Sequence, residues 1–196
     1  MPTERSEFET EVRALVERVL EGVLDGPAPT LDAPADRPPH TDRGERIAVG
    51  ADHGGFALKQ KIIARLREAG WPVEDCGTDS EEACDYPDIA HRVARRVTKG
   101  DCAWGIMIDG AGIGSAMAAN KVPRVRAAAC YDLSTARNSR EHNRANVLTL
   151  GAGLTGDALA WQIVQEWLAT PWGGDRHLRR VALIDEIEDT YARSEA

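Results

Sequence analysis

The chain has 196 residues, 42% of them hydrophobic, and a formal net charge of −8. This length accommodates one domain of about 150 residues plus a further segment, so we expect a single hydrophobic core. The negative charge argues against nonspecific binding to nucleic acid, which requires a basic face. The first residues lack the apolar core of a secretory signal, and no run approaches the roughly 18 apolar residues of a membrane span, so the sequence predicts a cytoplasmic protein.

Apolar residues near the amino terminus recur with the 3.6-residue period of an amphipathic helix. They are Phe8, Val12, Leu15, Val16, Val19, Leu20, Val23 and Leu24. Gly26 and Pro27 follow as helix-ending residues. We therefore expect a separate N-terminal helix at 1–25, whose apolar stripe needs a surface to cover it.

Residues 26–45 are rich in proline and poor in apolar side chains, which predicts a stiff, disordered linker. The helix before it either docks on its own domain or between copies of the chain, or it occupies a groove of another partner. A membrane-surface role is disfavoured because the polar face is rich in glutamate. A short helix followed by such a linker resembles the encapsulation peptides that load enzymes into bacterial microcompartments, which implies a shell protein as the partner of residues 1–25.

From residue 46 onward, short apolar strands alternate with amphipathic helices. Strands are predicted at 47–51, 71–76, 104–108, 124–129 and 146–151, and the clearest helices at 56–69, 87–99, 157–168 and 176–191. Five βα units with short connections imply an α/β fold, an open parallel sheet covered by helices on both sides. Residues 46–196 therefore form the folded domain.

One stretch of this domain combines a buried strand, an acidic residue and a glycine loop. The apolar run 104–108 ends at Asp109, and Gly110, Gly112 and Gly114 precede an alanine-rich helix. Glycines permit close approach of a ligand, and unpaired N–H groups at a helix start favour an anion. In many α/β proteins such a loop only makes the turn. The carboxylate favours a ligand site, because open parallel sheets bind ligands at this edge.

Other polar residues follow predicted strands or stand near the ends of predicted helices. They are Asp52, His53, Asp85, Tyr86, the run 141–146 and the run 176–180. If the strand ends converge, several of them join the glycine loop. Taken singly, each also has a structural explanation: His53 caps a helix, Tyr86 packs beneath it, and the arginines are solvated charges.

The four cysteines are scattered without the spacing of metal ligands. In a reducing compartment we expect Cys76, Cys84, Cys102 and Cys130 to be small buried or half-buried residues.

Seven motifs carry a resemblance to a known family. They are Gly50-Ala51-Asp52-His53-Gly54-Gly55-Phe56, Asp85-Tyr86-Pro87, Gly110-x-Gly112-Ile113-Gly114, Ala118-Ala119-Asn120-Lys121, Ser139-x-x-His142-Asn143, Asn146-Val147-Leu148 and Arg176-His177-x-x-Arg180. With these motifs, residues 46 to about 188 resemble the ribose-5-phosphate isomerase B family, which includes the galactose-6-phosphate isomerase subunits. The first 45 residues lie outside the resemblance.

The resemblance implies a Rossmann-like αβα sandwich with no metal and no nucleotide cofactor. It also implies a homodimer or a dimer of dimers in which the active sites are shared between subunits. The reaction is aldose–ketose isomerisation of a phosphorylated sugar by ring opening, proton removal from C2, an enediolate, and reprotonation at C1. These steps require an acid or base at the ring oxygen, a base at C2, N–H donors for the enediolate, and cations for the phosphate.

Carried over by position, the resemblance implies roles for individual residues. The resemblance implies that His142 is the ring-opening residue, and we take Asp109 as the C2 base of the predicted catalytic pair. The residues implied to bind substrate are Asp52 and Asn143 for the sugar, Tyr86 as part of the pocket wall, the amides of Gly110, Gly112 and Gly114 for the enediolate, and His53, Arg176 and Arg180 for the phosphate.

The chain departs from the family pattern in three respects: the catalytic base, a hydroxyl residue of the loop and a phosphate-binding arginine. Asp109 stands where many members have a cysteine, and Ser115 stands where others have a glutamate. Ala111 replaces a hydroxyl residue, and Gly153 replaces a phosphate-binding arginine, for which Arg137 or Arg179 are candidate substitutes. The leading hypothesis is an isomerase of ribose 5-phosphate and ribulose 5-phosphate; the alternatives are an isomerase of another sugar phosphate and a catalytically silent binding or scaffold protein.

Overall fold

The computed structural model describes residues 46–192, without the side chains of Asp175, Arg176 and Ala192. The predicted N-terminal helix and linker lie outside these residues. The elements in chain order are β1 (Ile47–Ala51), α2 (Phe56–Glu68), β2 (Val73–Asp75), α3 (Tyr86–Thr98), β3 (Trp104–Asp109), α4 (Ile113–Ala119), β4 (Ala127–Ala129), α5 (Leu133–Asn143), β5 (Val147–Gly151), α6 (Asp157–Ala169) and α7 (Asp175–Ala192). The alternation of strands and helices predicted from the sequence is confirmed.

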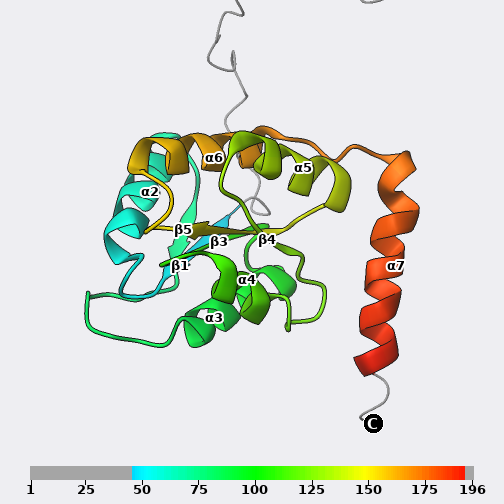
Figure 1. The fold of residues 1–196 in the computed structure, drawn as a ribbon, viewed down its shortest axis with the longest axis horizontal. Coiled ribbons are helices and arrows are strands. Elements are labelled where there is room, and N and C mark those ends of the chain that lie inside the picture. Colours follow the sequence, from blue (N-terminus) through cyan, green and yellow to red (C-terminus); the bar gives the residue numbers. More distant parts are fainter. Residues whose placement is uncertain (1–45, 193–196) are drawn as a thin grey trace, which may run out of the picture. The chain divides into compact units, whose positions relative to one another are not determined.

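The five strands form one parallel sheet in the order β2-β1-β3-β5-β4. Helices α2, α5 and α6 cover one face and α3 and α4 cover the other (Figure 1). The predicted fold class, an αβα sandwich around a parallel sheet, is therefore confirmed. β4 is shorter than the predicted 124–129, because Arg124 adopts a positive φ of 65° in the turn before the strand.

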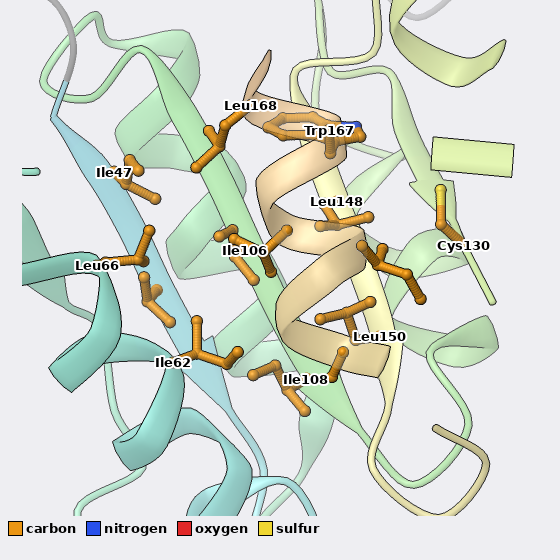
Figure 2. Packing of buried hydrophobic residues seen from close by; sticks show 14 of the residues in the cluster. Ile47, Ile62, Leu66, Ile106, Ile108, Cys130, Leu148, Leu150, Trp167 and Leu168 are labelled. Carbon is orange, nitrogen blue, oxygen red and sulfur yellow. The ribbon is translucent and has the colours of Figure 1, made fainter. Parts of the chain in front are cut away.

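The core lies on both faces of the central strands because side chains alternate along a β-strand. Ile106 and Ile108 of β3 pack with α2 and α6, whereas Met107 between them packs with α3. Figure 2 shows the larger cluster, in which Leu148 and Leu150 of β5 join the β3 isoleucines beside α6. Each of these side chains is fully buried. Burial of such a side chain stabilises the folded state by about 1.5–3 kcal/mol relative to leaving it exposed.

Helix α7 differs from the other helices because most of its apolar side chains are exposed. Leu178, Leu183, Ile184, Ile187 and Tyr191 are between 44% and 73% exposed. Polar contacts hold the helix: Arg124 pairs with Asp189 at 2.7 Å, and Arg126 pairs with Asp185 at 3.1 Å. No helix among residues 46–192 is long and apolar enough to cross a membrane.

Candidate active site

The glycine loop joins β3 to α4 at the carboxyl edge of the sheet. Gly112 has φ 80°, and a Cβ atom there would lie 2.9 Å from the carbonyl carbon of Leu150. Both the positive φ and the close approach to β5 require glycine. The loop is therefore pressed against the neighbouring strand.

The Asp109 side chain is directed into this loop. Its Oδ1 accepts hydrogen bonds from Ala111 N, at 2.7 Å, and from Gly112 N. Its Oδ2 accepts from Ser115 N, at 3.0 Å, and from Ser115 Oγ. Asp109 is 4% exposed. An ionised carboxylate has about four lone-pair sites, so these four bonds occupy its acceptor capacity.

The Asp109 carboxylate therefore occupies several of the loop N–H groups that could otherwise bind an external anion. The N–H groups of Ala111, Gly112 and Ser115 are used internally. In the described part of the chain, the N–H groups of Gly110 and Gly114 have no acceptor. Of the three amides predicted to bind an anion, those of Gly110 and Gly114 are unpaired among the described residues, whereas that of Gly112 is bonded to Asp109.

The carbonyl groups of the loop are also fixed. Tyr131 Oη donates to the Ala111 carbonyl at 3.1 Å, and Thr149 Oγ1 donates to the Gly112 carbonyl at 2.7 Å. Hydrogen bonds from the segment after β4 and from β5 thus support the loop, and Tyr131 and Thr149 are supporting residues that sequence reasoning missed. No local pattern identifies them, because they follow or lie on strands distant in sequence.

Asp52 and His53 follow β1 at the same edge. Asp52 is buried, and its Oδ1 accepts from Gly55 N at 2.9 Å. A Cβ atom on Gly54 would lie 3.4 Å from Asp52 Oδ1 and 3.9 Å from Gly110 N, which places the carboxylate close to the glycine loop. Nδ1 of the exposed His53 ring lies 3.2 Å from the backbone nitrogen and 3.3 Å from the carbonyl oxygen of Cys84. With Nδ1 directed at the Cys84 backbone, Nε2 is the ring nitrogen that can face a ligand.

Tyr86 begins α3 and lies against the glycine loop. A Cβ atom on Gly114 would be 2.7 Å from Tyr86 Oη, so glycine at 114 allows the aromatic ring to approach. Tyr86 remains 39% exposed. The structure thus brings together Asp52, His53, Tyr86, Asp109 and the loop from different parts of the chain.

His142 and Asn143 lie elsewhere, in the last turn of α5. This helix runs antiparallel to the strands and ends just before β5, whose first residue, Val147, pairs with Gly105. Asp109 lies four residues beyond Gly105 along β3. At the rise of a parallel strand, this separates the two residues by about 13 Å. Within one chain, the two predicted catalytic residues therefore lie at opposite edges of the sheet.

The surroundings of His142 contain a residue that sequence reasoning left without a role. His177 of α7 stacks on the His142 ring, with centroids 4.3 Å apart and planes inclined by 21°. Its only sequence signal is its place inside the Arg176-His177-x-x-Arg180 motif. Arg180 is exposed on the same helix, and the Arg176 side chain lies outside the described residues.

Three of the four thiols are buried. Burial raises the pKa of Cys76 to about 11 and that of Cys102 to about 12, and nearby Glu74 adds to both shifts. Burial also raises the pKa of Cys130. These thiols are protonated at neutral pH, and Cys84 is partly exposed. The expectation of buried and half-buried cysteines is confirmed. Among residues 46–192, no group of three or more His, Cys, Asp or Glu side chains is placed to hold a metal ion.

Fold and site together define an α/β protein with a candidate ligand site at the carboxyl ends of parallel strands, built around a glycine loop. Residues 47–184 match the family described as Ribose/Galactose Isomerase, and the chain belongs to this family.

Individual relatives agree with this assignment. Ribose-5-phosphate isomerase B of Escherichia coli is 45% identical over 144 residues, which cover 74% of this chain and 97% of that protein. The structure of Clostridium thermocellum ribose-5-phosphate isomerase B has a TM-score of 0.74 and 48% identity, covering 74% of this chain and 99% of that one. A Mycoplasma genitalium ribose-5-phosphate isomerase B structure with bound ribulose-5-phosphate has a TM-score of 0.72 and 37% identity. The match covers 76% of this chain and 99% of that one.

Proposed function

We propose that the chain interconverts ribose 5-phosphate and ribulose 5-phosphate through an enediolate. The observation that carries this proposal is the rigid glycine loop, whose Gly110 and Gly114 N–H groups remain without acceptors beside Asp52 and Tyr86. Preorganised N–H donors stabilise a developing oxyanion. Family membership and a relative that holds ribulose-5-phosphate support the same substrate class.

In the proposed reaction, His142 gives a proton to the ring oxygen of the closed sugar as the bond between C1 and the ring oxygen breaks. The C1 hydroxyl loses its proton to solvent as the aldehyde forms, and solvent returns a proton to His142. Asp109 then removes the C2 proton, and the electron pair moves to the carbonyl oxygen to form the enediolate. The protonated Asp109 returns the proton to C1, and transfer of the C2 hydroxyl proton to the C1 oxygen gives the ketose. General acid–base steps of this kind typically contribute about 10²–10⁴-fold each.

Proton transfer to Asp109 requires that one of its four hydrogen-bond donors leaves. Three donors are backbone N–H groups of the rigid loop, and the fourth is the Ser115 hydroxyl. The hydroxyl can rotate without movement of the backbone. We propose that Ser115 Oγ–H turns away from Oδ2 when substrate binds, which exposes the base.

The remaining proposed roles are those that the family resemblance implies. Asp52 and Asn143 hold sugar hydroxyls, and Tyr86 forms the wall of the pocket. His53, Arg176 and Arg180 bind the phosphate, since charge-assisted hydrogen bonds to phosphate are strong. A backbone N–H of Gly153 is bonded to the Gly110 carbonyl at 3.0 Å, so this position supplies loop support in place of a cation.

The opposite locations of Asp109 and His142 support an active site shared between two copies of the chain, as a homodimer or within a tetramer. A second copy supplies His142, Asn143 and the α7 arginines to the carboxyl edge of the first. A groove of about 810 Å³ between β4 and α7 supports this arrangement, because exposed apolar residues of α7, among them Ile184 and Ile187, line it.

The proposed activity is tested by following the conversion of ribose 5-phosphate by the purified full chain without added metal. We expect turnover in wild type and a loss of at least about 100-fold in His142→Ala. Turnover of a different pentose or hexose phosphate, with none of ribose 5-phosphate, would assign another substrate.

The occupied Asp109 carboxylate favours one alternative, a protein that binds a sugar phosphate without converting it. Calorimetric binding of ribose 5-phosphate, together with no turnover of any sugar phosphate, would support this alternative over the isomerase.

For the N-terminal segment we propose a targeting function: residues 1–25 direct a cytoplasmic enzyme to the shell of a bacterial microcompartment. The amphipathic pattern and the proline-rich linker support this proposal. Residues 1–40 fused to a fluorescent reporter should form foci in shell-forming cells and stay diffuse in shell-free cells. A diffuse signal in both would contradict it, and deletion of these residues should leave turnover unchanged.

A further inference from the structure

We infer that His177 is a positioning residue that holds the His142 imidazole in its ring-opening orientation through a parallel stack. This inference rests on the proposed function. The two rings are 4.3 Å apart at their centroids, with planes inclined by only 21°. They come from different elements, α5 and α7, so the stack depends on the tertiary structure.

The His177 ring is itself held firmly. His177 is 4% exposed, and its backbone N–H donates to the Gly174 carbonyl at 3.1 Å. The Trp172 ring meets it edge-on, with centroids 6.2 Å apart. A buried, doubly contacted ring provides a fixed surface for its neighbour.

The segment that carries His177 is also attached to the end of α5. Gly173 N donates to the Glu141 carbonyl at 2.9 Å, and a Cβ atom at Gly173 would lie 2.7 Å from that oxygen. The Arg144 guanidinium lies 6.0 Å from the Trp172 ring centroid. These contacts hold the segment just before α7 against the residues on both sides of His142.

The two nitrogens of the His142 ring have different neighbours. Asn138 Nδ2 lies 3.0 Å from His142 Nδ1, and Asn143 Nδ2 lies 3.4 Å from Asn138 Oδ1. Because Oδ1 accepts from Asn143, the Asn138 amide donates to Nδ1, which places the imidazole proton on Nε2. Glu141 Oε1 is 3.5 Å from Nε2. Asn138 thus selects the tautomer, and His177 fixes the ring plane.

Orientation matters because His142 is only half-buried at a helix end. Without the stack, its side chain gains rotational freedom and Nε2–H points at the sugar ring oxygen for less of the time. Misplacement of a catalytic group by about 1 Å can cost about 100-fold in rate. The effect should fall on ring opening and not on proton transfer at C1 and C2.

Two variants and two reactions separate these steps. His177→Ala removes the stack, and His177→Phe keeps a planar ring. Conversion of ribose 5-phosphate requires ring opening, whereas exchange of the C1 proton of open-chain ribulose 5-phosphate in D₂O does not. His91→Ala, at an exposed histidine on α3, is the matched control.

We expect His177→Ala to lower kcat for conversion about 10- to 100-fold while C1 exchange stays within about threefold. His177→Phe should retain most of the conversion rate, and His91→Ala all of it. Equal loss of conversion and exchange in His177→Ala, unchanged conversion in that variant, or a Phe variant as slow as the Ala variant would each overturn the inference.

A second measurement is independent of turnover. The stack displaces the His142 ring proton resonances through the ring current of His177; this displacement should disappear in His177→Ala and persist in His177→Phe. If wild type shows neither conversion nor exchange, the proposed function fails. In that case the resonances alone decide whether His177 orients the His142 ring.

Discussion

At the scale of single residues, Asp109 combines two properties that oppose each other. It stands at the end of the central strand, where the sequence predicts a base. Its carboxylate nevertheless accepts four hydrogen bonds from its own loop. Base catalysis and loop support therefore compete for the same lone pairs, and substitutions at 109 and 115 separate the two roles.

We predict that Asp109→Asn lowers kcat by at least about 10³-fold, because an amide is not a base. Asp109→Cys should retain more activity than Asp109→Asn, since a thiolate can accept the proton even though it cannot replace four hydrogen bonds. Ser115→Ala should stay within about threefold of wild type, because the hydroxyl leaves Oδ2 during the reaction. Initial rates on ribose 5-phosphate measure all three.

Circular dichroism and thermal unfolding are the controls for these variants, since loss of loop hydrogen bonds costs about 1–3 kcal/mol for each unsatisfied group. If folded Asp109→Cys and Asp109→Asn are equally inactive, Asp109 organises the loop and another group is the base. A collapse of activity in Ser115→Ala would contradict the proposed rotation of the hydroxyl.

At the scale of elements, the order and type of strands and helices follow from local patterns, because buried parallel strands read as short apolar runs and helices as 3.6-residue periods. The residues at which strands and helices begin and end are harder to predict from the sequence. β4 begins three residues after the predicted start, because Arg124 and Arg126 bind α7 instead of extending the strand. The thiols beside β2 give this region a measurable response to pH.

We predict that stability falls in alkaline solution through Cys76 and Cys102. Burial raises their pKa values from an ordinary 9.0 to about 11 and about 12. Between pH 9 and these values the unfolded chain binds fewer protons than the folded one, so the free energy of unfolding decreases as pH rises. The stabilising contribution of these two thiols is fully present below pH 9. It is lost as the pH rises through their pKa values in the folded chain, about 11 and about 12.

Thermal unfolding midpoints in a reducing buffer across this alkaline range test the prediction. At neutral pH, Cys102→Ala should have a somewhat lower unfolding midpoint than wild type, because a buried side chain is shortened. As the pH rises, its midpoint should fall by less than that of wild type. Curves for wild type and Cys102→Ala that stay parallel would show that this thiol does not contribute.

At the scale of the whole molecule, the two halves of the proposed site lie at opposite edges of one sheet. Asp109 ends β3, while His142 ends an antiparallel helix. A chain that belongs to an isomerase family but separates these residues within one copy is expected to work as an oligomer, with α7 and the β4 edge between copies.

Mixing two inactive variants tests this arrangement. In a dimer of Asp109→Asn and His142→Ala chains, one site carries both substitutions and the other carries neither. Random exchange of subunits makes half the dimers mixed, so about 25% of wild-type activity should return. The unmixed variants are the control, and continued inactivity after denaturation and refolding together would contradict a shared site.

The sequence by itself determined the α/β class, the position of the glycine loop, and the set of polar residues at the strand ends, because hydrophobic period and chain direction are local properties. Only the tertiary structure decided that Asp109 turns into its own loop, that His142 lies at the other edge, and that His177 stacks on it. Rotamers and contacts between distant elements depend on how the sheet and helices pack, and no local pattern encodes that packing.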